Sequence, residues 1–152
     1  MKNKIKSEEF LAIESKIVPI LQESEYHLID IDIKKGKEYF VSLFIFSEDK
    51  DKMGIDQITK LNESIYPLIE NMSFLRNGFL FEISSPGIFR RVRFFNEFEI
   101  FKGRSIKLVM NDDSKVLGTN EGVIDDTLQL VDGKGEKQLV RLEDIKKAML
   151  NG

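Results

Sequence analysis

Three arginines follow a Ser-Ser-Pro-Gly turn near the middle of this sequence, and they form its clearest group of side chains able to bind a charged partner. Arg90, Arg91 and Arg93 stand close behind Pro86 and Gly87. Guanidinium groups form planar, charge-assisted pairs with phosphate and carboxylate oxygens, and backbone amides also bind phosphates. The pattern therefore indicates a surface that binds phosphates or an acidic protein.

The charge around these arginines is local. The whole chain has a formal net charge of −3, yet between residues 90 and 107 six basic residues stand against two acidic ones. A solvated charged face is the alternative explanation, but the predominance of arginine over lysine favours binding. The predicted partner-binding residues are Ser84, Ser85, Pro86, Gly87, Arg90, Arg91, Arg93, Lys102 and Arg104.

Residues that could carry out catalysis are scarce. The chain has no cysteine and a single histidine, His27, and a lone histidine is more often structural than catalytic. No P-loop, nucleophile elbow or dinucleotide-binding glycine motif is present. Asp112-Asp113 and Asp125-Asp126 could hold magnesium in a metal-dependent nuclease, but acidic pairs of this kind are usually turn formers. We therefore expect no enzyme, no metal and no cofactor.

The elements before the turn should form one domain. Apolar spacing predicts a helix over 7–24 and a second helix that carries Ile58 to Ile69. Each contains a proline that should kink or end it. Alternating apolar residues predict strands over 26–34, 38–47 and 79–84. The order helix-strand-strand-helix-strand predicts an N-terminal two-layer α/β domain over 1–86.

The elements after the turn are of a different kind. Short alternating runs predict strands over 104–110, 115–124, 127–132 and 137–141, followed by a helical turn that begins at Leu142. Closely spaced short strands are typical of a small β-barrel. We therefore expect an α+β protein with a short stiff linker over 87–93 and a second domain over 94–152.

Aromatic residues also allow two interpretations. Phe94, Phe95, Phe98 and Phe101 are spaced as on a helix, and the chain has 12 phenylalanines in all. Exposed phenylalanines could stack on the bases of single-stranded RNA. Phenylalanines at helical spacing beside isoleucine and leucine are more often core residues, which is the interpretation we favour.

Composition also indicates where the protein works. No apolar run approaches the roughly 18 residues of a membrane helix, and the start of the chain lacks the apolar segment of a signal peptide. The absence of cysteine fits a reducing compartment. We expect a cytoplasmic protein without membrane contact.

The ordered motifs resemble those of the bacterial ribosome maturation factor family RimP. The similarity rests chiefly on "ISSPGI" at 83–88, Arg90, and "FNEFEIFKGRSIKL" at 95–108, with weaker support from "YHLIDIDI", "GIDQITKLNESI" and "EDIKKAML". One position departs from the family, which usually has Asp-Arg-Pro where this chain has Phe89-Arg90-Arg91. The arginine is kept, while the acid and the proline are lost.

This resemblance implies both a fold and a function. It implies a C-terminal SH3-like (Sm-like) barrel in a non-enzymatic, cofactor-free factor that binds the free small ribosomal subunit late in assembly. It further implies contact with small-subunit ribosomal protein twelve near the decoding region and with ribosomal RNA, and a monomer when free. Arg90 occupies the family's arginine position and is the strongest single candidate. The alternative is a stand-alone Sm-like RNA-binding regulator that oligomerises through barrel edge strands.

Overall fold

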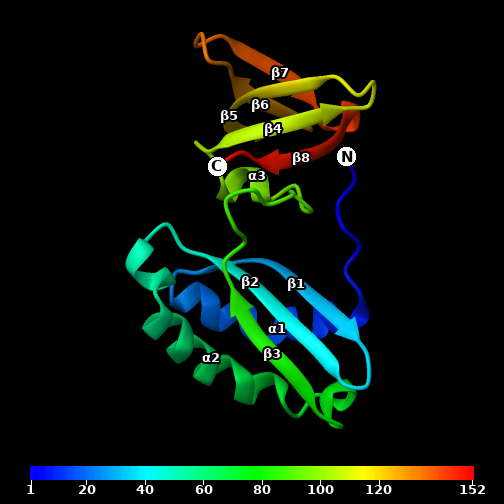
Figure 1. Cartoon of the computed structure of the whole chain (residues 1–152), viewed down its shortest axis with the longest axis vertical. Coiled ribbons are helices and arrows are strands. Elements are labelled where there is room, and N and C mark those ends of the chain that lie inside the picture. Colours follow the sequence, from blue (N-terminus) through cyan, green and yellow to red (C-terminus); the bar gives the residue numbers. More distant parts are fainter. The chain divides into compact units, whose positions relative to one another are not determined.

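The computed structural model describes all 152 residues, which form two compact units. One unit is Lys6–Pro86, and the other is Gly87–Gly152 together with Met1–Ile5. Each unit has a sheet of its own (Figure 1). The α+β class with two sheets is therefore confirmed.

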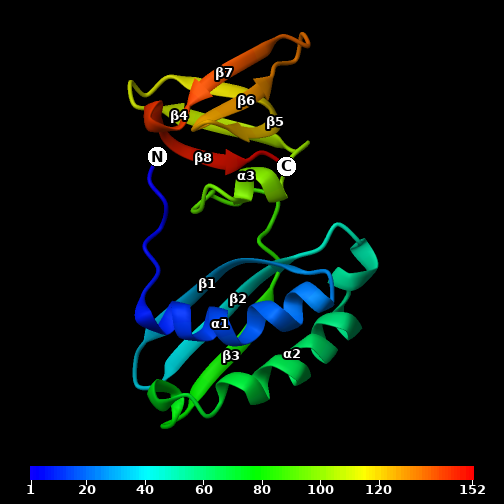
Figure 2. The same ribbon diagram turned by 180° about the vertical axis from the view of Figure 1, so that it is seen from behind.

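The Lys6–Pro86 unit has two helices and three strands in the predicted order. Its elements are α1 (Glu8–Glu23), β1 (His27–Lys35), β2 (Tyr39–Phe46), the 3-10 turn η1 (Lys50–Met53), α2 (Ile55–Ile69), the 3-10 turn η2 (Ser73–Leu75) and β3 (Phe79–Ser84). The sheet order is β1-β2-β3, with β1 antiparallel and β3 parallel to β2. A parallel pair needs a crossover, which α2 supplies. Figure 2 shows both helices on the same face of this sheet.

The core of this unit follows the helical and strand periods of the sequence. The buried residues of α1 are Phe10, Ile13, Ile17 and Leu21, those of α2 are Leu61, Ile65 and Ile69, and β2 contributes Val41, Leu43 and Ile45. Ser7 caps α1, since its hydroxyl accepts from the Phe10 amide at 3.1 Å. Neither helix ends at its proline: Pro19 and Pro67 both lie within their helices. Packing of the apolar stripe maintains α1 beyond Pro19, which is itself exposed.

The second unit is built around a five-stranded antiparallel sheet. Its elements are α3 (Glu97–Ile100), β4 (Ser105–Met110), β5 (Lys115–Ile124), β6 (Thr127–Val131), β7 (Lys137–Arg141), the 3-10 turn η3 (Leu142–Asp144) and β8 (Ile145–Leu150). The four predicted strands are confirmed, and the strand order is β7-β6-β5-β4-β8. No ladder joins β7 to β8, so hydrogen bonds do not close this sheet into a barrel. The SH3-like assignment stays a prediction.

The last strand corrects the sequence-based assignment. The expected helical turn at Leu142 is present as the three-residue turn η3, but the chain then enters β8, a strand that the sequence analysis did not predict. Ala148 pairs with Leu108 of β4, and both side chains are fully buried. Pairing with β4, which lies far away in the sequence, therefore determines the conformation of this segment.

The acidic pairs lie in turns, as expected. Asp125 and Asp126 have φ values of 50° and 59°, and two successive positive values are what a type I′ hairpin turn between β5 and β6 requires. Asp112 accepts from the Ser114 hydroxyl at 2.6 Å and from the Ser114 amide at 2.9 Å. These bonds, the hydroxyl first, lower the pKa of Asp112.

The expected linker over 87–93 is part of the second unit. Arg91 forms an antiparallel β-bridge with Met149, and the Val92 amide donates to the Ala148 carbonyl at 2.8 Å. Val92 is buried in the core of this unit. Backbone bonds to β8 thus attach this segment, which the sequence analysis expected to be a linker, to the second unit.

The first five residues also differ from the predicted domain boundary, which grouped them with the first domain. The Lys4 amide donates to the Arg93 carbonyl at 2.9 Å, and Asn3 Oδ1 accepts from the Phe95 amide at 2.7 Å. The amine of Met1 donates to the carbonyls of Leu142 and Ile145. These bonds attach Met1–Ile5 to the Gly87–Gly152 unit.

Deleting residues 2–5 should lower the free energy of unfolding of the second unit by about 1–3 kcal/mol, because several hydrogen bonds worth about 0.5–1.5 kcal/mol each are lost. Denaturation followed by far-UV circular dichroism checks this. All three tyrosines, Tyr26, Tyr39 and Tyr66, lie in Lys6–Pro86, so tyrosine fluorescence should show an unchanged transition. The control is Ile5→Ala, since Ile5 is 90% exposed. If the deletion shifted the fluorescence transition and left the other transition unchanged, the assignment of Met1–Ile5 to the second unit would be contradicted.

Candidate functional site

The Ser-Ser-Pro-Gly turn begins where β3 ends. The Ser84 hydroxyl donates to the Ser85 carbonyl at 3.1 Å, and Ser85 is exposed. Gly87, which opens the second unit, has a φ of +82°, and a Cβ built there would meet nothing within 4 Å. Glycine is therefore favoured here by the backbone conformation and not by lack of space. Phosphate binding by the amides of this turn stays a prediction.

Arg90, the strongest predicted contact, is engaged inside the second unit. Its Nε donates to Glu97 Oε1 at 2.7 Å and its Nη2 donates to Glu97 Oε2 at 3.0 Å. The side chains of Arg90 and Glu97 are 8% and 0% exposed. The forked pair occupies the guanidinium, so the structure gives Arg90 a structural role instead of a surface contact.

Glu97 does more than neutralise Arg90. Its Oε2 also accepts from the backbone amides of Arg93 and Phe94, each at 2.9 Å. One carboxylate on α3 thus holds both the Arg90 side chain and the backbone at 93–94. This fixes the segment on which Arg91 and Arg93 are presented.

Arg91 and Arg93 line a groove on the second unit with a volume of about 220 Å³. This basic groove is lined by Met1, Lys2, Lys4, Arg91, Val92, Arg93, Lys146 and Lys147. Six of these residues are cationic, and no acidic residue lines the groove. Lys146 pairs with Asp113 at 2.7 Å, where both side chains are more than half exposed. The groove is therefore a concave surface with a strong excess of positive charge.

Lys102 and Arg104 do not line this groove. Lys102 lies 3.8 Å from Glu99 in an exposed pair, and the Arg104 guanidinium lies 5.9 Å from the centre of the Phe101 ring. The structure thus brings together two of the five predicted cations, Arg91 and Arg93. It places Arg90 in the interior of the unit and leaves the other two outside the groove.

Four lysines of the groove were not among the predicted binding residues. Lys2 and Lys4 lie near the start of the chain, while Lys146 and Lys147 lie in β8. The basic start of the chain and the Lys-Lys pair were visible signals. Nothing local indicated that segments more than 140 residues apart would share one groove.

The structure also places the residues of the other interpretations. His27 is exposed, and no group of three or more His, Cys, Asp or Glu side chains is placed to hold a metal ion. Phe98 and Phe101 are 0% and 1% exposed and Phe94 is 7% exposed, which confirms a core role for these three. No helix has the length and apolar character needed to cross a membrane.

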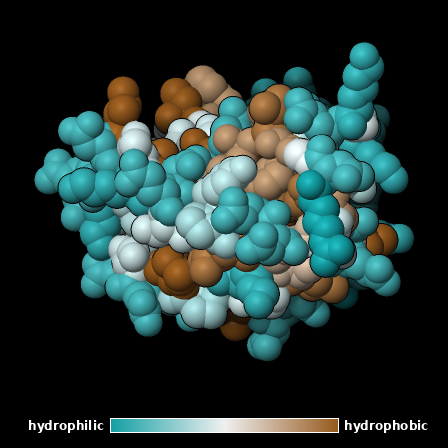
Figure 3. Space-filling model, turned by 90° about the horizontal axis from the view of Figure 1, so that it is seen from below, coloured by the Kyte–Doolittle hydropathy of each residue, from teal (hydrophilic) through white to brown (hydrophobic).

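On the face shown in Figure 3, apolar side chains lie among hydrophilic ones. In the view of Figure 3, hydrophilic side chains predominate and hydrophobic ones lie between them in small groups. On the first unit, the exposed large hydrophobic residues are Leu11, Ile55, Tyr66 and Leu80. They come from α1, α2 and β3, and single exposed apolar residues are normal on a soluble surface.

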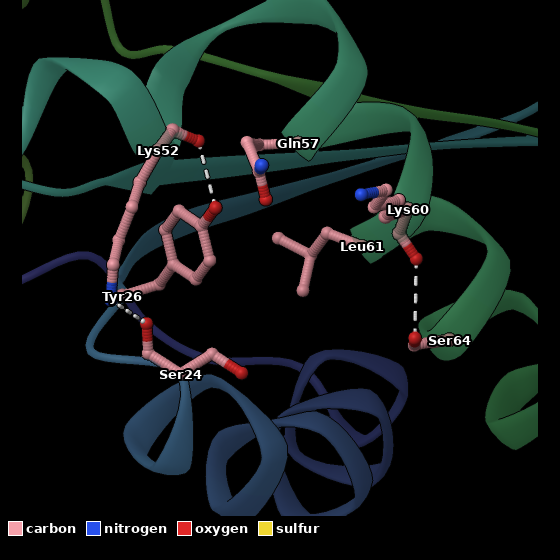
Figure 4. A pocket seen from close by; sticks show the side chains of 7 residues that line it. All are labelled: Ser24, Tyr26, Lys52, Gln57, Lys60, Leu61 and Ser64. Atoms are coloured by element: carbon pink, nitrogen blue, oxygen red, sulfur yellow. Dashed lines mark hydrogen bonds between the residues drawn. The ribbon is translucent and has the colours of Figure 1, made fainter.

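A second hollow, of about 260 Å³, lies on the first unit beside α2 (Figure 4). The Tyr26 hydroxyl donates to the Lys52 carbonyl at 2.7 Å, and Lys52 Nζ donates to the Ser24 carbonyl at 2.7 Å. Burial raises the pKa of the Tyr26 phenol, while Lys52 opposes this effect and Asp49 adds to it. Ser64 donates back to the Lys60 carbonyl at 3.1 Å. These polar groups satisfy one another within the fold and do not converge on a reacting centre.

Comparison with known proteins identifies the first unit. Residues 16–89 match the family description "RimP N-terminal domain". The proteins named "Ribosome maturation factor RimP" from Borreliella afzelii and Borrelia garinii are 31% identical over 86 residues and 33% identical over 87 residues, respectively. Over these residues the chain resembles RimP proteins.

The RimP match has clear limits along the chain. Each alignment covers 57% of this chain, and the chain spans 58% of the length of each of these RimP relatives. The matched RimP domain includes Ser84–Gly87 and ends before Arg91 and Arg93. A chain from the solved structure named "Structural basis of the Dcp1:Dcp2 mRNA decapping complex activation by Edc3 and Scd6" is 23% identical over 36% of this chain and 58% of its own length. The TM-score of this comparison is 0.34.

Proposed function

We propose that the protein is a ribosome maturation factor that binds the free small ribosomal subunit late in its assembly. Similarity of residues 16–89 to the RimP N-terminal domain carries this proposal, since the matched relatives are named for ribosome maturation. The factor acts by binding, without catalysis or cofactor, in the cytoplasm. Its partners are ribosomal RNA and small-subunit ribosomal protein twelve near the decoding region.

The second unit supports this proposal through its charge and its fold. Arg91 and Arg93 lie in the basic groove, and a cationic groove attracts an RNA-rich particle even when the whole chain is acidic. We also propose that this unit is a small SH3-like domain. The last strand, β8, returns beside the first strand of the sheet, β4, as in a sheet that curls towards closure.

Sedimentation with purified ribosomal particles tests the proposed function. We expect the protein to travel with free small subunits in a sucrose gradient and to be absent from the whole-ribosome fractions. Equal recovery in both fractions would contradict the proposed specificity, and absence from both would contradict the function. Protein sedimented alone in a parallel gradient is the control for self-association.

The alternative, a ring-forming Sm-like regulator, is favoured by one observation, namely that β7 and β8 are both edges of an unclosed sheet. Ring formation would need pairing of such edges. We nevertheless expect a monomer, because β7 carries Lys137 and Arg141 at its ends and β8 is already bridged by Arg91, and charged or covered edges resist pairing. Light scattering measures the molecular mass in solution. A monomer mass that stays constant on dilution supports the ribosome maturation factor, whereas the mass of a stable ring would favour the Sm-like regulator.

A further inference from the structure

We propose that the basic groove binds the phosphate backbone of RNA without reading its sequence. The inference deepens the proposed function, on which it rests for the origin of the RNA. The lining is contributed by the start of the chain, by the 91–93 segment and by β8, all within the second unit. Four of its cations, Lys2, Arg91, Arg93 and Lys147, form no ion pair with a carboxylate.

The cationic surface continues from the groove onto the outer face of the sheet. Met149 is bridged by Arg91 on one side and paired with Lys107 on the other, so these three side chains point to the same face. Lys147, two residues before Met149, points the same way and is paired with Val109. The opposite face carries Leu108 and Ala148, which are fully buried. Arg91, Lys107 and Lys147 therefore lie on the solvent side.

The spacing of these cations suits a linear polyanion such as a phosphate backbone. Adjacent strands lie about 4.8 Å apart, so the backbones at Arg91 and Lys107, two strand spacings apart, are separated by roughly 10 Å. Lys115 extends the row, because it is paired with Val109 on the far side of β4. A linear polyanion that enters the groove can thus meet further cations as it crosses the sheet.

The composition of the groove favours RNA over an acidic protein. Protein interfaces are usually anchored by aromatic and apolar residues at a dry centre. The apolar side chains of the groove are Met1 and Val92, and Val92 is only 4% exposed. With six cationic lining residues and no exposed apolar anchor, the groove offers charge without a hydrophobic centre, which is how proteins hold nucleic-acid backbones.

The same composition implies binding without sequence preference. The groove contains no aromatic residue on which a base could stack and no Asn or Gln for base edges. Binding through phosphates releases counterions, and for a single strand the logarithm of the affinity falls by about 0.7 for each contact per logarithmic unit of salt. We therefore expect a steep salt dependence that is similar for different sequences.

The test measures binding of the full chain to fluorescein-labelled uridine and adenosine oligomers of equal length by anisotropy across a salt series. The groove variant is Arg91→Gln/Arg93→Gln/Lys147→Gln. It should bind at least about tenfold more weakly at low salt, with a salt slope reduced by about two units. The control is Lys134→Gln/Lys137→Gln/Arg141→Gln, which makes the same change in net charge on β7 and its turn, at the opposite edge of the sheet. It should bind almost as the unchanged protein does.

The outcomes separate this inference from the proposed function. Equal losses in both triple variants, or no binding of either oligomer at low salt, would overturn the groove as an RNA site. Competition by polyglutamate as effective as that by RNA would overturn it in favour of an acidic protein partner. A strong preference for one oligomer would overturn the backbone-only mode.

If RNA binding behaves as expected but small subunits are not bound, the proposed function fails while the groove assignment stands. Circular dichroism checks that both variants are folded.

Discussion

Replacing Glu97 with alanine should destabilise the second unit by about 3–5 kcal/mol, because removing one partner of a buried ion pair leaves an uncompensated charge. The Glu97 side chain is 0% exposed and Arg90 is 8% exposed. Two backbone amides, those of Arg93 and Phe94, also lose their acceptor. Denaturant unfolding followed by far-UV circular dichroism measures the loss.

The matched control is Glu99→Ala on the same helix. Glu99 pairs with Lys102 at 3.8 Å, with both side chains more than half exposed, and exposed pairs contribute about 0–1 kcal/mol. Tyrosine fluorescence, which reports only Lys6–Pro86, should show the same transition for both variants. Similar losses for Glu97→Ala and Glu99→Ala would contradict the assigned importance of the buried pair.

Replacing Asn120 should have the next largest effect. Asn120 is 0% exposed, its Nδ2 donates to the Phe98 carbonyl at 2.8 Å, and its Oδ1 accepts from the Gly122 amide at 2.9 Å. Asn120→Ala leaves both buried backbone groups without these partners, and each unsatisfied group costs about 1–3 kcal/mol. We expect a total loss of about 2–5 kcal/mol in denaturant unfolding of the second unit. The control is Asn111→Ala at an exposed turn position.

Asn120→Asp adds a pH-dependent test of the same bond. The introduced carboxyl donates to the Phe98 carbonyl only when it is protonated, so burial and the lost donor raise its pKa in the folded state above the ordinary value of about 3.9. A raised folded pKa means that stability is retained at low pH and lost as the pH rises through that pKa. Relative to the original protein at each pH, Asn120→Asp should therefore be least destabilised in acid. A constant difference across pH, as expected for Asn120→Ala, would contradict the assigned direction of the hydrogen bond.

The first unit was largely predictable because its signals are local. The apolar spacing of α1, with buried Phe10, Ile13 and Ile17, follows the helical period, and β2 follows the strand period. The two prolines were a poor guide to the helix ends, because both lie inside their helices. A proline removes one hydrogen bond of its own helix, whereas packing of the apolar stripe onto the sheet stabilises every turn around it.

The candidate site was predictable only in part. The cluster of arginines correctly indicated a basic surface on the second half of the chain, and Arg91 and Arg93 do line the basic groove. The sequence analysis ranked Arg90 above them, whereas the structure places Arg90 in a buried ion pair. All three are arginines in one short segment, and the difference arises because Glu97 lies buried beside only one of their guanidinium groups.

By itself the sequence determined the helices and strands of the first unit, the turn at Pro86-Gly87 and the hairpins of the second, because side-chain period and turn chemistry act between near neighbours. The tertiary structure alone decided that 145–150 is a strand, that Met1–Ile5 belongs with the second unit and that lysines from both ends of the chain meet Arg91 and Arg93. The physical reason is that β8 is stabilised by pairing with β4 and with the segment at Arg91. These contacts join residues far apart in the sequence, which no local pattern encodes.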